Sequence, residues 1–476
     1  MDTRSDFLYR QFLDGFAYPP TPCQDRLLRQ VGRFLCSDDG DILVVNGYAG
    51  TGKTTAVSSV VSAMESLKVP CVLLAPTGRS AKVLSAYSGR PASTIHKHIY
   101  RQKSHSEDGF GQFSLKPNKA RNTLYVVDEV SLIGIDAGQP STTAFGTGNL
   151  LEDLMHFVRS GLDCRLLLIG DAAQLPPIGL DHSPALSESY MAGFGGVSFA
   201  TLTTVVRQQK DSGILHNATH LRELIGEDME IPLEGLELTT EGVPDIVRLR
   251  GAQLLDTLSD AYGRFGEDET VVLCRSNKRA NRYNAGIRAQ VLYKDDRLVR
   301  GDRLMIVKNC YQGVESLEGT DYIANGDMAK LVWIRHFEER YGLQFADACL
   351  CFPDYNDQEV EAKVLLDTLS SESASLSYEQ SNQLYQGVSA DYAHLPTRKK
   401  RYDAVREDPY FNALQLKYAD AITCHKSQGG QWKCVFIDNP FWQDFLVPDD
   451  LKWLYTALTR AVEQVYLVNF KDECFV

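Results

Sequence analysis

The sequence predicts an α/β fold in which a parallel sheet is covered by helices. Over roughly the first 200 residues, short apolar runs alternate with helical stretches, which is the pattern of βαβ units. The apolar runs read ILVVNG (42–47), VPCVLLAPT (69–77), TLYVVDEV (123–130) and CRLLLIGD (164–171). Each run ends in small, polar or acidic residues, and ligands of open α/β sheets bind at the carboxyl ends of the strands.

A second α/β block begins near Thr203 and is interrupted by an insertion. TVVLCRSN (270–277) reads as a strand, and the alternation resumes with AITCHKSQ (421–428) and CVFID (434–438). Between them lie a strand-rich stretch, 301–353, and a polar, helical-looking stretch to about residue 414. A chain of 476 residues is long enough for two or three domains at roughly 150 residues each.

Two segments, 103–119 and 135–149, break the alternation of the first block with Gly, Ser, Pro and charged residues. We interpret both as insertions or loops. In the first, Phe110 and Phe113 lie beside glycines, so we expect a small hairpin that carries two exposed aromatic rings. The sequence does not distinguish local packing of these two rings from a functional role.

The composition is that of a folded, water-soluble protein, with 43% hydrophobic and 23% charged residues. No run approaches the roughly 18 apolar residues of a membrane span, and the N-terminus MDTRSDFLYRQF lacks the apolar core of a secretion signal. We therefore expect a cytoplasmic protein with no membrane partner. Its 11 cysteines form no C-x-x-C pair, so we expect free buried thiols rather than a metal or disulfide framework.

The net charge of −13 argues against a protein that coats nucleic acid, because phosphate binding needs a local basic surface. A narrow binding groove is compatible with this charge. The strongest local exception is the run Arg-Lys-Lys-Arg at 398–401, which we interpret as a solvated helix end rather than a binding patch.

The segment 47–54, Gly-Tyr-Ala-Gly-Thr-Gly-Lys-Thr, matches the phosphate-loop pattern G-x-x-x-x-G-K-[ST] and lies between a strand and a helical stretch. The glycines let successive backbone N–H groups turn toward phosphates, and Lys53 supplies a point charge to the β/γ oxygens. We expect Thr54 to bind Mg²⁺ through its hydroxyl. The segment therefore predicts a site that binds and hydrolyses a nucleoside triphosphate.

Two carboxylates, Asp128 and Glu129, follow the apolar strand 124–127 at the same edge of the predicted sheet. Hydrolysis needs one acid for the Mg²⁺ shell and one to orient or deprotonate the attacking water, and we assign these tasks to Asp128 and Glu129. A third strand, 165–169, ends in Gly-Asp-Ala-Ala-Gln-Leu-Pro-Pro, where Gln174 is placed to sense the γ-phosphate. Simple turn chemistry is the alternative explanation of this last segment.

Together and in this order, the motifs resemble those of the superfamily 1 helicases, in particular the RecD-like and Dda-like branch. The resemblance runs from about Gln24 to Ala461. Its other segments are LLAPTGRSAK (73–82), ASTIH (92–96), LLIGDAAQLPPIG (167–179), VVRQ with DSGIL (205–215), YADAITCHKSQG (418–429) and LYTALTRA (454–461). The resemblance implies two RecA-like P-loop motor domains, each a parallel sheet with helices on both faces.

The resemblance assigns nucleotide-site roles in both domains. Gln24 is similar to the glutamine that reads the adenine edge, which favours ATP, and Arg207 and Arg460 match the two arginines that the second domain presents to the γ-phosphate. The catalytic set is Lys53, Glu129, Gln174, Arg207 and Arg460, and the Mg²⁺ set is Thr54 and Asp128. The ATP-binding set is Gln24, Gly47, Gly50, Thr51, Gly52, Lys53, Thr54, Thr55 and Gln431.

The resemblance also implies contacts to a bound single strand through short hydroxyls, backbone amides and a few cations. These residues are Thr77, Arg79, Thr94, His96, Thr423, His425 and Lys426. Segment 97–121 stands where the family has a wedge hairpin at the duplex junction, so Phe110 and Phe113 would bind DNA by stacking on or splitting base pairs.

We expect the first RecA-like domain over 1–202 and the second over 203–298 and 415–476. Residues 299–353 resemble an SH3-like accessory domain, and the polar extension 354–414 has no assigned role.

The chain departs from the family pattern at two positions. It has Asp-Glu-Val-Ser at 128–131 where relatives commonly have Asp-Glu-Ala-Ser, a change that keeps both carboxylates. Gln431 stands where many relatives have a glutamate, and its amide can still hydrogen-bond a ribose hydroxyl.

The resemblance implies a monomeric ATP-dependent DNA helicase that moves 5′ to 3′ on single-stranded DNA and unwinds duplex junctions in replication, recombination or repair. Two alternatives are open. An RNA helicase of the same superfamily would make the same backbone contacts. A subunit that hydrolyses ATP as a switch but never unwinds would suit the acidic net charge.

Overall fold

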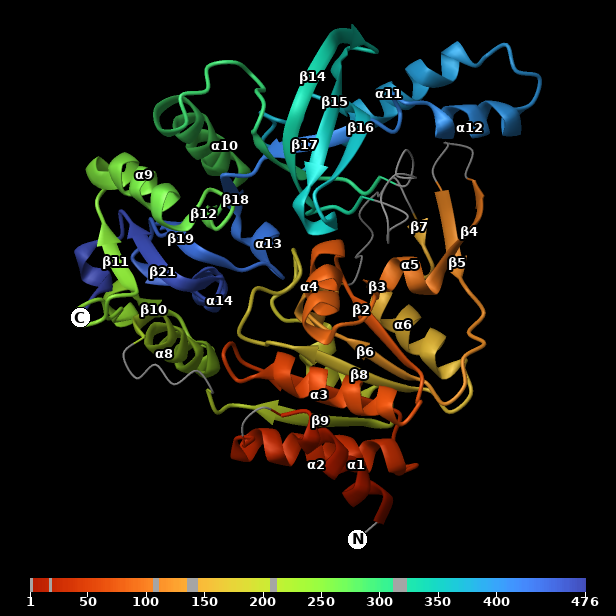
Figure 1. The fold of residues 1–476 in the computed structure, drawn as a ribbon, viewed down its shortest axis with the longest axis vertical. Helices are drawn as coiled ribbons and strands as arrows, with labels where there is room; N and C mark the ends of the chain where they lie inside the picture. Colours follow the sequence, from red (N-terminus) through yellow and green to blue (C-terminus); the bar gives the residue numbers. More distant parts are fainter. Residues whose placement is uncertain (1–2, 17–18, 106–110, 135–143, 206–211, 311–322) are drawn as a thin grey trace. The chain divides into compact units, whose positions relative to one another are not determined.

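The computed structural model describes residues 3–16, 19–105, 111–134, 144–205, 212–310 and 323–476 (Figure 1). The chain folds as two compact units. The first comprises Met1–Pro232 and Phe445–Thr459, and the second comprises Leu233–Asp444 and Arg460–Val476.

The first unit is built on a six-stranded sheet in which every strand pairing is parallel. The strands, in spatial order, are β3 (Ala92–Thr94), β2 (Cys71–Ala75), β6 (Leu124–Val127), β8 (Arg165–Gly170), β1 (Ile42–Gly47) and β9 (Val197–Leu202). Since all strands run in one direction, their carboxyl ends meet at one edge of the sheet. Strands β6, β8 and β1, which precede the predicted nucleotide motifs, are neighbours there.

Side chains along these strands alternate between two cores, one on each face of the sheet. Leu43 and Val45 face the core that contains α1 (Thr3–Asp14), α2 (Pro22–Cys36), α3 (Lys53–Ser66) and Leu84 of α4 (Gly78–Ser88). Ile42 and Val44 face the core that contains α5 (Ile95–Ile99) and α6 (Leu150–Arg159). Burial on both faces explains the continuously apolar strands. The predicted α/β class is confirmed.

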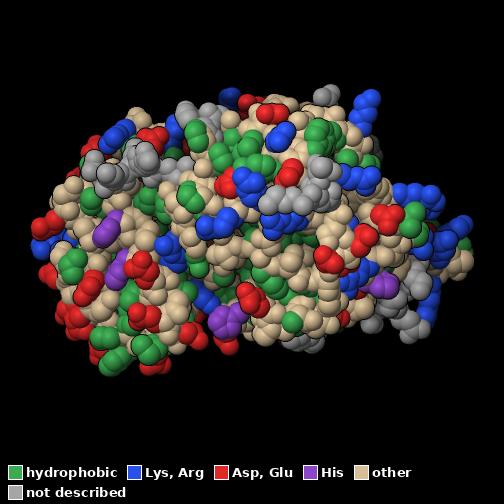
Figure 2. Space-filling model, turned by 90° about the horizontal axis from the view of Figure 1, so that it is seen from below, with side chains coloured by type: hydrophobic (Ala, Val, Ile, Leu, Met, Phe, Trp, Pro, Cys, Tyr) green, Lys and Arg blue, Asp and Glu red, His purple; other side chains and the backbone are tan. Residues whose placement is uncertain are grey.

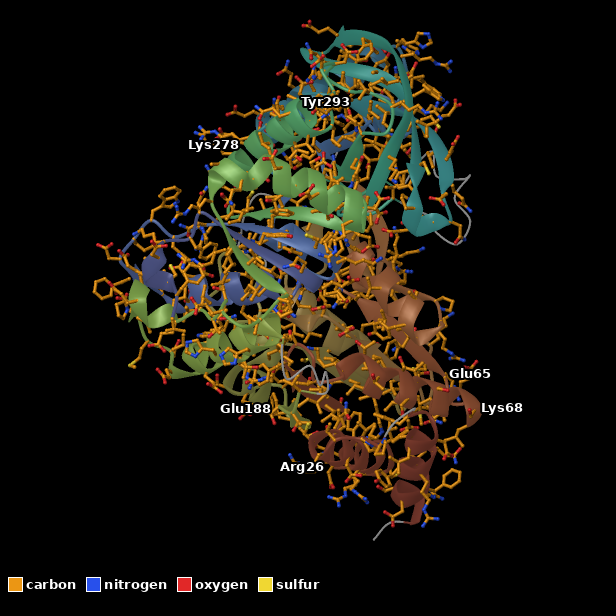
Figure 3. The ribbon with its side chains drawn as sticks, turned by 60° about the vertical axis from the view of Figure 1, so that its left-hand side comes forward. Arg26, Glu65, Lys68, Glu188, Lys278 and Tyr293 are labelled. Carbon is orange, nitrogen blue, oxygen red and sulfur yellow. The ribbon has the colours of Figure 1, made fainter. Side chains whose placement is uncertain are left out.

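The phosphate-loop helix α3 runs from this sheet edge to the outer surface. It begins at Lys53, and Glu65 in its last turn and Lys68 just beyond it lie side by side on the outside (Figure 3). Glu65 forms an ion pair with Arg90, which follows α4. The distal end of α3 therefore faces solvent, while its first turn remains at the strand ends.

The two interrupting segments contribute to one small sheet. β4 (Tyr100–His105) and β5 (Gly111–Leu115) form an antiparallel hairpin, and β7 (Ala144–Phe145) pairs in parallel with β5. The buried Tyr100 hydroxyl donates to Asp153 of α6 over 2.7 Å and fixes the base of the hairpin. The hairpin expected in 103–119 is confirmed, although its first strand already begins at Tyr100.

The first unit also contains α8 (Gly213–Glu227) and, from far along the chain, α14 (Pro448–Leu458). The Leu175 N–H donates to Thr456 Oγ1 over 2.8 Å, and Lys452 Nζ donates to the carbonyl of Asp181 over 2.7 Å. The structure thus groups α14 with the first unit, whereas the sequence boundaries place it in the second domain.

The second unit contains a five-stranded sheet that is again parallel. In spatial order its strands are β11 (Ile246–Leu249), β21 (Ala461–Val468), β19 (Trp432–Asp438), β12 (Thr270–Cys274) and β18 (Ala421–Thr423). Leu258 and Phe265 of α9 (Leu254–Phe265) and Ala280 of α10 (Asn277–Gly286) share a core with Val272 of β12. This is the second α/β domain that the sequence predicts.

A closed barrel interrupts this domain in the sequence. Its strands are β13 (Arg303–Ile306), β14 (Met328–Arg340), β15 (Leu343–Phe352), β16 (Gln358–Leu365) and β17 (Leu414–Tyr418). The helical interpretation of the stretch after 353 is wrong over β16. There Val360 and Val364 are buried and the intervening Glu361 and Lys363 are not, which is the two-residue period of a strand.

Two helices, α11 (Tyr378–Asp391) and α12 (Arg398–Glu407), extend from the barrel between β16 and β17 (Figure 1). Leu384, Val388 and Val405 anchor them on Phe345 of β15. The basic run 398–401 forms the first turn of α12, and Lys399 and Lys400 are exposed, as expected of a solvated helix end.

Within the described ranges, no helix combines the length and apolarity needed to cross a bilayer. All 11 cysteines lie in these ranges and are free thiols, as the sequence predicts.

A buried carboxylate joins the barrel to the second α/β domain. Asp302, only 1% exposed, accepts from Arg288 Nη2 over 2.9 Å and from the Val299 N–H over 2.8 Å. Lys294 Nζ lies 3.2 Å from its other oxygen. Its removal would leave a buried arginine without its counter-charge.

Asp302→Ala is expected to lower the free energy of unfolding by about 3–5 kcal/mol, because the Arg288 charge stays buried and unpaired. Urea unfolding measures the change. Asp295→Ala, at an exposed position nearby, is the matched control with an expected change within about 0.5 kcal/mol. Equal destabilisation by the two substitutions would contradict the assignment.

Candidate functional site

The phosphate loop leaves β1 at Gly47 and enters α3 at Lys53. Gly50 and Gly52 have φ values of 75° and 77°, in the left-handed region that side chains other than glycine rarely adopt. Gly52 caps the N-terminus of α3 without a side chain. The loop therefore presents backbone N–H groups and the positive end of a 14-residue helix at one point.

Lys53 lies folded back over the loop. Its Nζ donates to the Gly47 carbonyl and lies 3.7 Å from Oδ2 of the fully buried Asp171. The close packing of its side chain is visible at Gly47, where a Cβ atom would fall 2.6 Å from Lys53 Cγ. A cation, helix dipole and turned amides together suit an anionic phosphate, so these residues fit a bound nucleotide.

Gln24 braces the loop from α2. Its Oε1 accepts from the Thr21 N–H over 2.9 Å and completes a capping box, and its Nε2 donates to the Thr51 carbonyl over 3.0 Å. Thr51 is itself buried, and its hydroxyl donates to the Tyr48 carbonyl over 2.8 Å. The amide nitrogen of Gln24 thus holds the loop while its oxygen caps α2, and its contact with adenine remains a prediction.

Asp128 and Glu129 follow β6 directly. The Glu129 N–H donates to Asp128 Oδ1 over 2.8 Å. Glu129 has a φ of 54° and a ψ of 39°, a left-handed conformation that costs a glutamate about 1–3 kcal/mol. A strained acid next to an oriented one is typical of a functional site rather than of a surface turn.

These oxygens are suited to Mg²⁺ in particular. Mg²⁺ is commonly held by one or two protein oxygens together with waters and substrate phosphates, and here the candidate donors are Asp128 and the exposed Thr54 hydroxyl. Within the described residues, no group of three or more His, Cys, Asp or Glu side chains forms a closed metal cage. The donor set fits a metal that arrives with its nucleotide.

The segment after β8 supplies a buried acid and a buried amide. Asp171 Oδ1 accepts from the Ala173 N–H over 3.0 Å. Gln174 is 5% exposed, and its Oε1 has no hydrogen-bond partner in the described part of the chain. A buried amide oxygen without a partner is costly, so Gln174 is poised to gain one, in keeping with the predicted role as a sensor.

Two tyrosines belong to this site although the sequence analysis did not single them out. The Tyr455 hydroxyl on α14 accepts from the Ala49 N–H over 2.9 Å and donates to Asp171 Oδ2 over 2.8 Å. The Tyr87 hydroxyl on α4 donates to Asp128 Oδ2 over 2.5 Å. Burial, together with the neighbouring carboxylate, raises the pKa of both phenols, so both are hydrogen-bond donors at neutral pH.

The predicted strand-binding residues of the first unit follow the two neighbouring strands β2 and β3. The Thr77 hydroxyl caps α4 by accepting from the Ser80 N–H over 3.1 Å, and the Thr94 hydroxyl caps α5 by accepting from the Lys97 N–H over 3.3 Å. Arg79 lies in the first turn of α4, and the His96 ring lies 5.7 Å from that of Tyr100. Both threonines thus carry a structural task, and their DNA contacts remain predictions.

Phe113 does not protrude as a wedge residue should. It is half-buried and packs on the core of the first sheet, on the face that contains Tyr100 and Phe157. This contact favours the local packing that the sequence left open. Phe110 lies outside the described residues, as does Arg207.

The second unit has a threonine in the N-cap position at the end of β18, although its side chain does not cap the helix that follows. Thr423 is the N-cap residue of α13 (Cys424–Ser427), which contains His425 and Lys426. Lys426 Nζ donates to Asn325 Oδ1 over 2.7 Å, and burial, aided by Lys417, lowers the pKa of Lys426 to about 8. Burial thus disfavours the charged form of Lys426, and a bound anion beside it would favour that form.

Arg460 and Gln431 lie close together in this unit. Arg460 is 5% exposed and its Nη1 donates to the Gly430 carbonyl over 3.3 Å, whereas Gln431 is exposed. The Trp432 N–H donates to the Arg460 carbonyl over 3.0 Å. These contacts fix the Arg460 backbone at the start of β21, and its role toward the γ-phosphate remains a prediction.

Comparison with known families yields two matches. Residues 24–229 match the family described as AAA domain, and residues 418–468 match the family described as UvrD-like helicase C-terminal domain. Together they describe an AAA domain that contains the phosphate loop and a second domain of the UvrD-like helicase C-terminal type. The barrel lies outside both matches.

Curated relatives match mainly by segments. The chain is 37% identical over 137 residues to the ATP-dependent RecD2 DNA helicase of Deinococcus radiodurans, covering 29% of this chain and 16% of the relative. It is 28% identical over 154 residues to the ATP-dependent DNA helicase dda of Enterobacteria phage T4, covering 32% of this chain and 31% of the relative. The matches thus span less than a third of each relative.

Solved structures match over nearly the whole chain. The Pif1 helicase from Bacteroides in complex with ADP-AlF3 and ssDNA has a TM-score of 0.51 at 15% identity, covering 96% of this chain and 95% of that chain. A structure described as forked-dsDNA unwinding by two coordinating Pif1 helicases has a TM-score of 0.50 at 16% identity, covering 96% and 94%. At this identity the likeness concerns the fold, which is that of two RecA-like domains with an accessory barrel.

The order of the motifs, the two family matches and the shared fold agree. The chain belongs to the superfamily 1 helicases, and its matched segments are similar to those of RecD2 and dda.

Gly47→Ala is expected to weaken nucleotide binding by roughly 10-fold or more, because the added methyl group would displace Lys53, at about 1–3 kcal/mol. Equilibrium titration with a fluorescent ATP analogue measures the change. Gly263→Ala is the control, since a Cβ at Gly263 in α9 meets no atom within 4 Å. Unchanged affinity in Gly47→Ala would contradict the tight packing of Lys53 against the loop.

Proposed function

We propose that the chain is an ATP-dependent DNA helicase that moves 5′ to 3′ along single-stranded DNA and opens duplex junctions. One observation carries the proposal. At a single edge of the first sheet, the nucleotide groups that follow β1, β6 and β8 lie next to Thr77 and Thr94, which follow β2 and β3. A change in nucleotide occupancy would thus reach residues of the kind that hold a DNA backbone.

The chemistry of ATP hydrolysis is divided among few residues. Lys53 and the loop amides bind the phosphates, and Asp128 with Thr54 would hold Mg²⁺, which neutralises charge on the β- and γ-phosphate oxygens when bound. Glu129, held in its strained turn, orients and deprotonates the attacking water. Gln174, with its unpartnered oxygen, detects the γ-phosphate.

The acidic net charge of −13 does not oppose DNA binding. The face drawn in Figure 2 carries basic side chains among acidic ones, and a translocating motor needs only a narrow contact line. Hydroxyl-bearing helix caps and a few cations such as Lys426 grip the backbone without reading sequence, which suits a protein that moves along DNA.

The polarity and the substrate are tested with duplexes that carry one single-stranded tail. We expect strand separation for DNA with a 5′ tail and none for DNA with a 3′ tail. An RNA duplex with a 5′ tail should stay closed, and unwinding of RNA alone would overturn the DNA assignment in favour of an RNA helicase. ATPase activity without any strand separation would instead identify a nucleotide switch.

Glu129→Gln separates binding from hydrolysis. We expect kcat for ATP to fall by about 10²–10⁴-fold, because a neutral amide cannot accept the proton of the water, while a fluorescent ATP analogue still binds. Lys53→Ala should lose both ATP turnover and binding of the fluorescent analogue. Retention of full turnover in Glu129→Gln would remove this residue from the chemical step.

Arg460→Ala tests the predicted arginine finger. We expect a loss of about 10³-fold or more in kcat with nucleotide affinity changed only a few-fold, as for other arginine fingers. Arg282→Ala, at an exposed position of the same unit, is the control for lost positive charge. Equal turnover in Arg460→Ala and Arg282→Ala would exclude Arg460 from the site.

A further inference from the structure

Tyr87 lies outside the helicase motifs named above and contacts Asp128, which precedes the proposed general base Glu129. Tyr87 is the next-to-last residue of α4, and its hydroxyl donates to Asp128 Oδ2 over 2.5 Å. The other oxygen of Asp128 already accepts from the Glu129 N–H over 2.8 Å. Both oxygens of this carboxylate therefore have a protein donor.

Two donors matter because the terminal torsion of an aspartate is soft and broad. With the Glu129 N–H alone, the carboxylate could swing about one hydrogen bond. With the Tyr87 hydroxyl on the opposite oxygen, the plane of the carboxylate is defined on both sides. The remaining lone pairs are then directed to fixed points, which is what a small octahedral cation requires of a ligand.

Tyr87 is itself held from the phosphate-loop helix. Ser58 Oγ on α3 donates to the Tyr87 carbonyl over 3.1 Å. α3 begins with Lys53 and Thr54, so the element that carries the predicted Mg²⁺ hydroxyl also fixes the backbone from which the phenol reaches Asp128. The two predicted Mg²⁺ ligands are thereby connected through one tyrosine.

We propose that Tyr87 is a positioning residue for Mg²⁺, acting through Asp128. The inference rests on the proposed function, since it assumes that Asp128 serves a nucleotide-bound metal. Tyr87 does not contact the metal; it sets the orientation of the group that does. Partners of this kind typically change metal affinity by about 10–100-fold when removed.

Tyr87→Phe isolates the hydroxyl, because the ring and its packing are kept. The readout is binding at equilibrium rather than turnover: a fluorescent, non-hydrolysable ATP analogue is titrated at increasing free Mg²⁺, and Mn²⁺ binding to the complex is followed by electron paramagnetic resonance. We expect the Mg²⁺ concentration for half-maximal binding to rise by roughly 10-fold, with affinity at saturating Mg²⁺ unchanged.

The matched control is Tyr9→Phe. Tyr9 on α1 also donates its hydroxyl to an aspartate, Asp25 on α2, which is not a predicted Mg²⁺ ligand. Tyr9→Phe should leave the Mg²⁺ concentration for half-maximal binding at the wild-type value. A shift of the same size in both variants would overturn the positioning role of Tyr87 and indicate a general effect on folding.

A double-mutant cycle shows whether the effect passes through Asp128. Tyr87→Phe should add nothing further to the loss of Mg²⁺ affinity in Asp128→Ala, whereas independent action would give additive losses and overturn the inference. If the wild-type chain binds the analogue without any Mg²⁺ dependence, the proposed metal chemistry fails. If only the difference between Tyr87→Phe and wild type is absent, the proposed function stands and this inference alone is overturned.

Discussion

The site of this protein depends on a geometrical constraint of parallel sheets: every strand delivers its carboxyl end to the same edge. In the first unit, β6, β8 and β1 are adjacent, although they are far apart in the sequence. The segments that follow them bring a phosphate loop, a pair of acids and a buried amide to one place. Strand pairing thus brings all of these segments to one edge at once.

The carboxylate of Asp171 is buried at this edge of the sheet and therefore needs hydrogen-bond and charge partners. A fully buried ionised acid is unfavourable unless it is paired and hydrogen-bonded. Asp171 meets this requirement with Lys53, the Tyr455 hydroxyl and the Ala173 N–H. These donors come from the phosphate loop, from α14 and from its own turn, so one side chain ties three parts of the first unit together. A substitution at any of them would disturb the others.

The residues predicted to contact single-stranded DNA also lie at the ends of parallel strands. Thr77, Thr94 and Thr423 each stand at the N-terminus of a helix directly after a parallel strand. At such a position a hydroxyl can cap the helix while free backbone N–H groups point outward. In the first unit, where Thr77 and Thr94 cap their helices, a residue that stabilises the fold is thus compatible with a surface that binds an anion. The barrel adds Asn325 beside Lys426 and so extends the polar surface at the end of β18.

Elements that depend on local interactions along the chain are predictable from the sequence. Continuous apolar runs fixed the strands, and glycines at Gly50 and Gly52 fixed a loop that requires positive φ. The motif order sufficed to assign the family, and the chemistry of Lys53, Asp128 and Glu129 is a prediction from the same motifs. In principle the alternation Val360, Ala362, Val364 also contained the strand β16, which the polar composition of its neighbours obscured.

Contacts between side chains that are distant in the sequence are not predictable in this way, because they depend on the packing of the whole fold. Tyr87 and Tyr455 look like ordinary amphipathic helix residues in the sequence. Their hydroxyls reach Asp128 and Asp171 across 41 and 284 positions of sequence. The structure likewise turned Phe113 toward the core and grouped α14 with the first unit. These contacts depend on how helices and strands pack in space. A local pattern of residues does not show which distant side chain will lie beside it in the folded protein.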